Sequence, residues 1–430
     1  MDTLNFEALF LGPQAENRDF LRRMLTFMLD EHIYWRRNFH PEDGRTITRA
    51  DQNRDDFVAT QRRLEAVFEE LSSKLKQSSL PHHSPRHLAH MASDVLMPAV
   101  IAYLGTVLYN PNNIAWEGSP ATTPLEQEVG IDFAKLVGYD PEHAFGHLTS
   151  GGHAANYEAL WIARNLKSIP LALQQVNPEF VDNMDEWQLM NLAPQEAMAL
   201  WHRTPALMAE VRQQSVHGKG MTPPSLGKVF VAQSKHYSWG KAVDLLGLGQ
   251  ESLVSVRVTE QYRMDVDDLN RKIRACIERD EPILAVVAIV GTTEEGAVDP
   301  IDQIVALRKQ YEAEGISFYI HVDAAYGGYI QSIFLDEQDK MLPLDEFKRR
   351  FYQAEPSPDL WPPVDVYHAY QALSEVDSIT LNPHKLGYVP FGAGGVVFKD
   401  GRMRNLISHL APYIFGLDNV EDAPFVPSSV

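Results

Sequence analysis

The sequence predicts an α/β fold with a mainly parallel central sheet and helices on both faces of that sheet. From about residue 145 onward, short apolar runs alternate with amphipathic stretches, which is the pattern of successive strand–helix–strand units. The most apolar run, residues 283–290, is typical of a strand buried on both faces, and it is far shorter than the ~20 residues of a bilayer span. Hydrophobic residues make up 44% of the chain and charged residues 22%, which excludes a mostly disordered protein.

The first 110 residues are polar and helical in pattern. Apolar residues at helical spacing predict a helix over residues 55–76. A second helix is expected over residues 88–108, with Pro98 as a kink or a boundary. Residues 1–110 are therefore expected to form a helical segment that precedes a large α/β domain over residues 111–400.

Strand and helix patterns alternate through the second part of the chain. A polar, mostly helical stretch, residues 171–219, is expected to be an excursion from the sheet. The predicted helices are residues 153–166, 240–246, 266–276 and 301–314. The predicted strands are residues 146–149, 228–232, 253–258, 283–290, 316–322, 378–381 and 394–398.

Charge and cysteine content narrow the possible partners. The chain carries 58 Asp and Glu against 38 Lys and Arg, a formal net charge of −20. Such an excess of carboxylates repels phosphate backbones and anionic lipids, so we expect neither nucleic acid nor membrane as a partner. The single cysteine, Cys276, excludes an internal disulfide and a zinc site built from several cysteines. It fits a reducing compartment, and with no secretory signal at the first residues a cytoplasmic location is expected.

A lysine directly follows one of the predicted buried strands. The segment Thr-Leu-Asn-Pro-His-Lys at residues 380–385 places Lys385 beyond an apolar run. Most lysines are solvated surface charges, but a charge that follows a buried strand needs a specific reason. Burial lowers the pKa of an amine and makes it a nucleophile, as a Schiff base with an aldehyde cofactor requires.

An aspartate closes another apolar strand. In Ile-His-Val-Asp-Ala-Ala-Tyr-Gly-Gly at residues 320–328, Asp323 is followed by small residues. Open α/β sheets bind ligands at the carboxyl ends of their strands. A carboxylate there could keep a pyridinium nitrogen protonated, which makes pyridoxal phosphate (PLP) an electron sink. The alternative is an ordinary turn or N-cap residue.

Two weaker signals follow other strands. Ser-Gly-Gly-His at residues 150–153 joins a strand to a helix, and bare amides at a helix N-terminus favour a phosphate. A Gly-Gly pair can also be a simple tight turn, and the glycine motifs of nucleotide-binding folds are missing. His236 follows the strand 228–232. It could stack on an aromatic cofactor or relay protons, or it could be an ordinary core or capping histidine.

These four signals occur in a fixed order: glycine turn, histidine, aspartate, lysine. With Asn-Tyr-Glu-Ala-Leu-Trp at residues 156–161 and Pro-His-Lys-Leu-Gly-Tyr-Val-Pro at residues 383–390, this order resembles the group II PLP-dependent amino-acid decarboxylases. Within that family, the sequence is most similar to bacterial tyrosine decarboxylase-like proteins. The resemblance runs from about residue 85 to the C-terminus. It implies the aspartate aminotransferase-like fold (fold type I), PLP as cofactor, an amino acid as substrate and a homodimer.

The resemblance also implies a role for each matching residue. Lys385 would hold PLP covalently, Asp323 would pair with its ring nitrogen, and His236 would stack on the ring. The other cofactor contacts that it implies are the opposite ring face at Ala325, the phenolic side at Thr293, and the phosphate at Gly152, His153, Asn382 and His384. No metal is expected. His87 and His90 are expected on one helix face, where the resemblance implies a place along the substrate pocket.

The implied reaction is decarboxylation of an L-amino acid to an amine and CO2, and two departures from the family leave alternatives open. Tyrosine decarboxylases commonly carry a tyrosine shortly after the lysine, which helps to protonate Cα, whereas this chain has Phe391. That change raises decarboxylation-dependent transamination to an aldehyde as an alternative. Family members also continue into a small C-terminal domain, so residues 401–430 are expected to be the start of a truncated or missing domain. An inactive PLP-binding subunit is therefore the third possibility, and tyrosine, aspartate and glutamate all remain candidate substrates.

Overall fold

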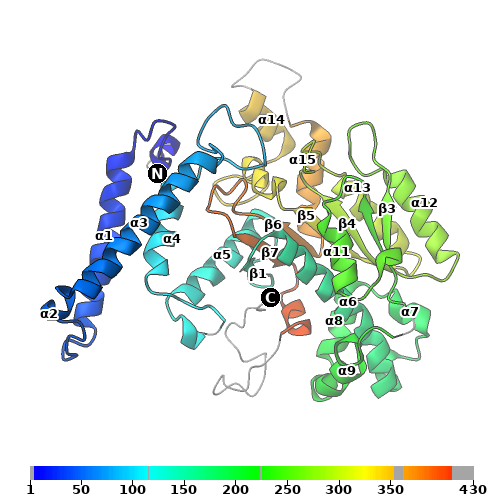
Figure 1. Cartoon of the computed structure of the whole chain (residues 1–430). Coiled ribbons are helices and arrows are strands. Elements are labelled where there is room, and N and C mark those ends of the chain that lie inside the picture. The colour runs from blue at the N-terminus through cyan, green and yellow to red at the C-terminus, as the bar shows by residue number, and fades with distance from the viewer. Residues whose placement is uncertain (1–3, 115, 223–224, 353–361, 409–430) are drawn as a thin grey trace. The chain divides into compact units, whose positions relative to one another are not determined.

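The computed structural model of the chain describes residues 4–114, 116–222, 225–352 and 362–408 (Figure 1). It divides into two compact units. One comprises residues 1–110 with residues 388–390, and the other comprises residues 111–387 with residues 391–430. Most of the segment 401–430, where the sequence predicts the start of a further domain, lies outside the described residues.

The N-terminal unit is helical. Its helices are α1 (Arg18–Asn38), α2 (Arg49–Gln52), α3 (Asp55–Ser78) and α4 (Met97–Val107). Helix α1 packs on α4 where Gly105 leaves room for the side chain of Met28. Helix α3 confirms the helix predicted over residues 55–76, and none of its residues is buried.

The helix predicted over residues 88–108 is wrong in its first half. Residues 88–96 contain no helix, and His90 and Met91 adopt positive φ angles of 66° and 51°, which a right-handed helix does not allow. Pro98 lies in the first turn of α4, where the missing N–H has no intrahelical partner to lose. The proline is therefore the boundary of the helix, and not a kink within it.

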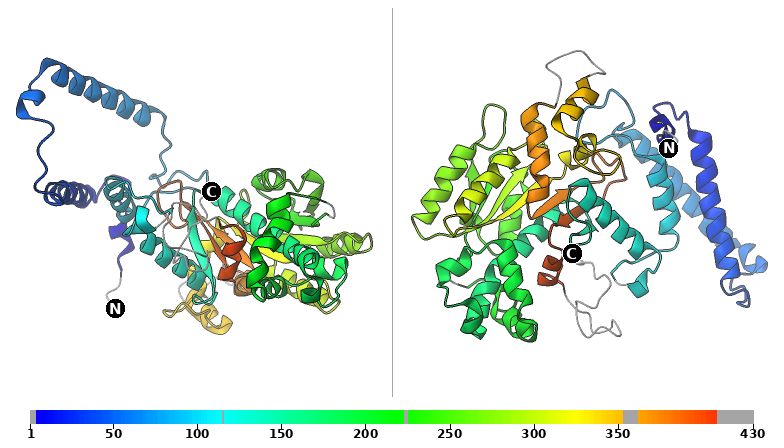
Figure 2. Two further views of the ribbon diagram at one scale, coloured as in Figure 1. Left: turned by 90° about the horizontal axis from the view of Figure 1, so that it is seen from below. Right: turned by 180° about the vertical axis from the view of Figure 1, so that it is seen from behind.

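The second unit is built on one seven-stranded sheet (Figures 1 and 2). Its strands are β1 (Phe145–Thr149), β2 (Lys228–Ala232), β3 (Leu253–Val256), β4 (Ile283–Ile289), β5 (Tyr319–Ala324), β6 (Ser378–Leu381) and β7 (Gly394–Phe398). Their order is β1-β7-β6-β5-β4-β2-β3. Only the pairs that involve β7 are antiparallel, so the predicted, mainly parallel sheet is confirmed.

Helices cover both faces of this sheet. Every residue of β4, β5, β6 and β7 is buried, and since successive side chains point to opposite faces, both faces are covered. Helix α6 (Gly152–Val176) crosses one face and contacts β1 and the four strands from β4 to β7. The other helices of this unit are α5 (Thr122–Leu136), α7 (Glu186–Met190), α8 (Pro194–His202), α9 (Met208–Gln214), α10 (Val216–Lys219), α11 (Ser238–Leu245), α12 (Val266–Ile277), α13 (Ile301–Glu312), α14 (Leu344–Tyr352) and α15 (Val364–Gln371).

Helices α7 to α10 form the predicted excursion between α6 and β2. Among the described residues, no helix combines the length and the apolar character that a bilayer crossing requires.

The topology brings the ends of β5 and β6 together. These two strands are parallel neighbours, and their register pairs Asp323 with Thr380 and Ala324 with Leu381. Residues that follow the two strands therefore lie at the same edge of the sheet. Helix α6 starts beside them after Gly151, whose φ of 152° is a conformation that side-chain-bearing residues rarely adopt.

Candidate active site

A cavity of about 280 Å³ lies at this edge of the sheet. Its wall contains the first turn of α6, the segments that follow β2 and β4, and the ends of β5 and β6. All nine residues for which the family resemblance implies cofactor contacts line it: Gly152, His153, His236, Thr293, Asp323, Ala325, Asn382, His384 and Lys385. The structure therefore brings the predicted residues together, while their individual roles stay predictions.

Lys385 lies in the turn that leaves β6. Its backbone N–H donates to the carbonyl of Asn382 at 2.9 Å, which fixes the turn. Burial lowers the pKa of the Lys385 amine, and the negative charge of Asp323 acts in the opposite direction. A lowered pKa increases the fraction of neutral amine, which is the form that attacks an aldehyde.

Asp323 is 6% exposed and lies in β5. Its Oδ2 accepts hydrogen bonds from Asn156 Nδ2 at 2.8 Å and from Trp239 Nε1 at 3.2 Å. Its Oδ1 accepts a longer bond of 3.3 Å from the backbone N–H of Ala325. The hydrogen bond from the Ala325 N–H is the kind expected of an ordinary turn residue, which was the alternative role of Asp323. The bonds from Asn156 and Trp239 go beyond that role, because they hold the carboxylate at the cavity.

Asn156 and Trp239 are the residues that the sequence analysis missed. Asn156 lies one helical turn beyond Gly152, on the same side of α6, and Trp239 is fully buried in α11. The four-residue spacing from the glycine turn to Asn156 was a usable signal. Nothing in the sequence near Trp239 indicates its contact with Asp323, because the two residues lie 84 positions apart.

The side chains of two histidines are in contact at the N-terminus of α6. The rings of His153 and His236 are 4.8 Å apart at 86°, an edge-to-face arrangement. The backbone N–H of Ser238 donates to His236 Nδ1 at 3.3 Å, so the proton of a neutral ring lies on Nε2. Burial lowers the pKa of both imidazoles, and both rings are therefore neutral near pH 7.

The glycine turn leaves space that a side chain would fill. A Cβ added to Gly152 would lie 2.9 Å from Asn382 Nδ2 and 3.3 Å from Ala325 Cβ. Asn382 Oδ1 and Ser234 Oγ are buried in the same wall and have no hydrogen-bond partner among the described residues. Buried polar atoms of this kind require a partner, so the wall is suited to a polar ligand. A nucleophilic lysine, a held carboxylate and a helix N-terminus together suit PLP, with its aldehyde, ring nitrogen and phosphate.

The histidine cluster before α4 does not form the predicted helix face. His87 lies outside any helix, and its ring packs edge-to-face on His82 at 4.7 Å within the N-terminal unit. His90 has a positive φ angle and also lies outside a helix. Across the described ranges, no group of three or more His, Cys, Asp or Glu is arranged to hold a metal ion.

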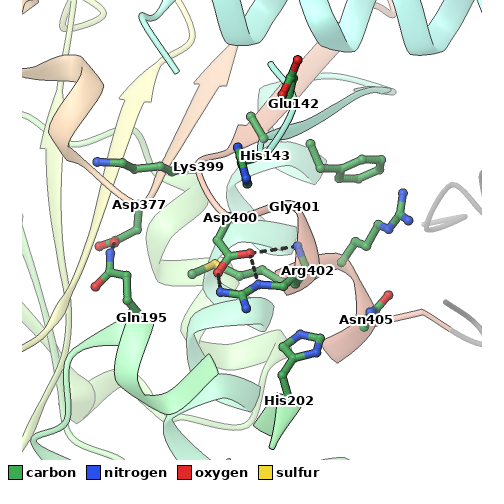
Figure 3. Close-up of a pocket in the computed structure, with 14 residues that line it drawn as sticks. Glu142, His143, Gln195, His202, Asp377, Lys399, Asp400, Gly401, Arg402 and Asn405 are labelled. Carbon is green, nitrogen blue, oxygen red and sulfur yellow. Dashed lines mark hydrogen bonds and ion pairs between the residues drawn. The ribbon is translucent and has the colours of Figure 1, made fainter. Parts of the chain in front are cut away.

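A second, larger cavity of about 760 Å³ lies at the opposite ends of the strands (Figure 3). Two of its acidic groups, Asp400 and Asp377, have hydrogen-bond partners. The guanidinium of Arg402 donates two hydrogen bonds to Asp400, and Asp377 accepts from Gln195 at 3.3 Å and from Arg308 at 2.7 Å. None of the nine predicted residues lines this cavity, so the candidate chemistry lies in the smaller one.

Fold and site together define a class of protein. A mainly parallel α/β sheet with a half-buried lysine and a carboxylate at the ends of two adjacent strands, beside a helix N-terminus, is the arrangement of a PLP-dependent enzyme of fold type I. The crystal structure of mouse CSAD has this fold, with a TM-score of 0.57 at 19% identity over 94% of this chain and 68% of that chain.

Sequence comparison identifies the family. Residues 212–343 match the pyridoxal-dependent decarboxylase conserved domain. The L-tyrosine decarboxylases of Levilactobacillus brevis and Enterococcus faecium are each 44% identical to this chain, over 417 and 419 residues. These matches cover 96% of this chain and 66% and 68% of the two relatives, so the chain spans about two thirds of their length. The chain belongs to the pyridoxal-dependent decarboxylase family, and its cofactor is PLP.

Proposed function

We propose that the protein removes the carboxyl group of an L-amino acid and releases an amine and CO2, with tyrosine as the first substrate to test. The observation that carries this proposal is the meeting of Lys385 and Asp323 in one cavity at the ends of two adjacent strands. The names of the two 44% identical relatives support tyrosine. A 29% identical aspartate 1-decarboxylase of Aliivibrio fischeri keeps aspartate among the substrates to be tested.

PLP, when bound, supplies an electron sink for the electron pair that remains on Cα as CO2 leaves. In the proposed assignment, Lys385 bonds to the cofactor, Asp323 holds the proton of the ring nitrogen, and His236 packs on the ring. Ala325 covers the opposite ring face and Thr293 the phenolic side. The phosphate contacts are assigned to Gly152, His153, Asn382 and His384.

The properties of these side chains suit the proposed roles. Burial lowers the pKa of the Lys385 amine, which increases the fraction of the neutral form that can attack an aldehyde. The neutral ring of His236 can cover an aromatic face without placing a second positive charge beside the Asp323–nitrogen pair. The N–H groups in the first turn of α6 can hold a phosphate without a cationic side chain.

We also propose a cytoplasmic homodimer, in which residues 111–400 form the PLP-binding domain. The dimer proposal rests on an apolar stripe along α3, formed by Leu64, Val67, Phe68, Leu71 and Leu75, each of which is between 49% and 62% exposed. These residues follow one helix face at spacings of three and four, as in a helix that packs on a partner. A second copy of the chain is the partner that we propose. The cytoplasmic location is supported by Cys276, which is a free thiol.

Absorbance and product analysis of the purified full chain test the proposed reaction. After incubation with PLP, we expect a visible absorbance band that borohydride abolishes, and CO2 release from a panel of L-amino acids that includes tyrosine, aspartate and glutamate. Lys385→Arg should remove both signals and retain the charge. Lys399→Arg is the matched control, because burial also lowers the pKa of Lys399 but this lysine lies outside the cavity. A wild-type protein that stays colourless, or that binds PLP and releases no CO2, contradicts the proposal.

A further inference from the structure

Behind Asp323 lies a buried chain of hydrogen bonds. Asn156 Nδ2 donates to Asp323 Oδ2, and Asn156 Oδ1 lies 3.2 Å from His321 Nε2. On the other side of the ring, His321 Nδ1 lies 2.8 Å from Ser378 Oγ. Thr380 Oγ1 lies 3.3 Å from the same Nε2 atom. None of these side chains is more than 6% exposed, so bulk water does not compete for their hydrogen bonds.

The donor and acceptor properties of these groups decide which atom donates in each hydrogen bond of the network. An ionised carboxylate only accepts hydrogen bonds, so the Asn156 amide must turn its nitrogen toward Asp323 and its oxygen toward His321. An amide oxygen also only accepts, so His321 Nε2 must carry the proton. Nδ1 of the neutral ring is then an acceptor, and the hydroxyl of Ser378 donates to it. One arrangement of protons satisfies Asp323, Asn156, His321 and Ser378, and the hydroxyl oxygen of Thr380 can accept from the same Nε2–H.

His321 is suited to this neutral state. It is 2% exposed in the middle of β5, and burial lowers the pKa of its imidazole to about 4, against the opposing effect of the Asp323 charge. A neutral histidine keeps one donor and one acceptor over the physiological range, whereas a protonated ring would donate from both nitrogens. The ring therefore does not reverse its hydrogen bonds when the pH changes near neutrality.

We propose that His321, held as its Nε2–H tautomer by Ser378, orients Asn156 so that Asn156 and Trp239 together fix Asp323 Oδ2 and leave Oδ1 for the ring nitrogen of the cofactor. Asn156, Trp239 and His321 are thus positioning residues for Asp323. The proposal rests on the proposed function through the role of Asp323. The state of His321 can nevertheless be measured in the protein without PLP.

The first experiment reads the histidine tautomer directly. The full chain, labelled with ¹⁵N-histidine and free of PLP, is studied by NMR, and His321→Gln identifies the His321 signals. We expect a protonated Nε2 and an unprotonated Nδ1, unchanged between about pH 8 and about pH 5 because of the low pKa. A ring protonated on Nδ1, or one that titrates near its ordinary pKa, overturns the proposal.

The second experiment measures PLP binding to matched variants of α6. Asn156→Leu removes the donor to Asp323, and Asn165→Leu removes a buried amide of the same helix that donates to Leu406 O at 2.8 Å, away from the cavity. We expect the PLP dissociation constant to rise roughly 10-fold or more in Asn156→Leu and to change less than about 2-fold in Asn165→Leu. Equal effects in the two variants would mean a merely structural role and would overturn the proposal.

A carboxylate in place of the amide adds a pH signature. In Asn156→Asp, the new carboxyl can donate to Asp323 only when it is protonated, so PLP should bind more tightly as the pH falls. The other ionisable groups around Asp323 are His153, His236, His321 and Lys385, and they are the same in wild type and variant. A pH dependence of PLP binding identical to that of the wild type contradicts the proposal. If the wild type does not bind PLP at all, the proposed function fails, and the tautomer measurement alone decides the present inference.

Discussion

The phenyl ring of Phe391 packs against the imidazole of His384, with 4.5 Å between the ring centroids and 46° between the ring planes. Phe391 lines the candidate cavity and is nevertheless 88% exposed. It therefore lies at the rim, beside a predicted phosphate contact. In tyrosine decarboxylases, a tyrosine is expected at the corresponding position, and its hydroxyl would add a proton donor here.

We expect Phe391→Tyr to raise the rate of amine formation roughly 10-fold and to lower any aldehyde by-product, because a general acid near Cα favours protonation there. Stability should change by less than about 0.5 kcal/mol at so exposed a site. Mass spectrometry of the products measures the amine-to-aldehyde ratio. Phe180→Tyr, an exposed phenylalanine outside the cavity, is the control. A ratio that is the same in Phe391→Tyr and in the wild type removes the argument for a missing acid.

The carboxylate of Asp323 should be required for turnover and not for folding. Asp323→Asn keeps the shape but lacks the charge that holds a proton on a ring nitrogen, so kcat should fall at least about 100-fold. Steady-state kinetics and thermal unfolding are the measurements. Asp268→Asn is the control, since Asp268 is also 6% exposed but accepts its hydrogen bonds from Arg257, Arg271 and Lys272, outside the cavity. Loss of activity that merely follows loss of stability in both variants would contradict the assignment.

Lys167 should make stability depend on pH above neutrality. This lysine is buried in α6, its Nζ donates to Ile283 O at 2.7 Å, and burial lowers its pKa to about 7. Between about pH 7 and pH 9, the unfolded chain binds this proton and the folded chain does not, so the free energy of unfolding rises with pH. The slope is about 1.4 kcal/mol per pH unit.

Urea unfolding of the wild type and of Lys167→Met at about pH 7 and about pH 9 measures this term as the difference between the two proteins. The wild type should gain roughly 2 to 3 kcal/mol relative to the variant over that range. Lys76→Met, on an exposed helix, should show no such gain. Parallel pH profiles for wild type and Lys167→Met would show that the buried amine stays charged.

The apolar stripe of α3 should control association. Phe68→Glu places a charge in the stripe, and the homodimer should weaken at least about 10-fold, since burial of one phenylalanine contributes about 1.5 to 3 kcal/mol. Sedimentation velocity over a concentration series measures the dimer. Ser73→Glu adds the same charge to an exposed position on the opposite face of the helix and serves as the control. A dimer of equal strength in both variants means that α3 is not the interface.

Strand positions were predictable from the sequence, but strand order was not. The bounds of β2, β6 and β7 agree with the predicted ranges because short runs of buried, β-branched residues carry that signal locally. The order of the sheet, and the antiparallel β7 between β1 and β6, depends on contacts far apart in the chain, which alternation does not encode. The helix predicted over residues 88–108 was too long, because the apolar pattern continues on the N-terminal side of Pro98, whereas α4 begins at Met97, next to this proline.

The site was predictable as far as its motifs follow strands. Lys385 and Asp323 are recognisable because Lys385 follows an apolar run and Asp323 ends one. The two runs form adjacent parallel strands, so the two residues lie close together at the same edge of the sheet. Trp239 and His321 act through tertiary hydrogen bonds, and a buried tryptophan or histidine in a sequence is first of all a core residue. Only the structure shows that Trp239 donates to Asp323 directly and that His321 is linked to Asp323 through Asn156.

One helix carries both the glycine turn and the amide that holds Asp323. Gly152 and Asn156 are separated by about one turn of α6, so the positions of the two residues are linked by the hydrogen-bonded backbone of the helix. Anchoring of a phosphorylated vitamer at the N-terminus of α6 would therefore also help to fix Asn156, four residues further along, and through its hydrogen bond the carboxylate of Asp323. Unphosphorylated pyridoxal would lack the phosphate contacts. It would also leave the N-terminus of α6 without an anchor, and Asp323 would then be held less firmly.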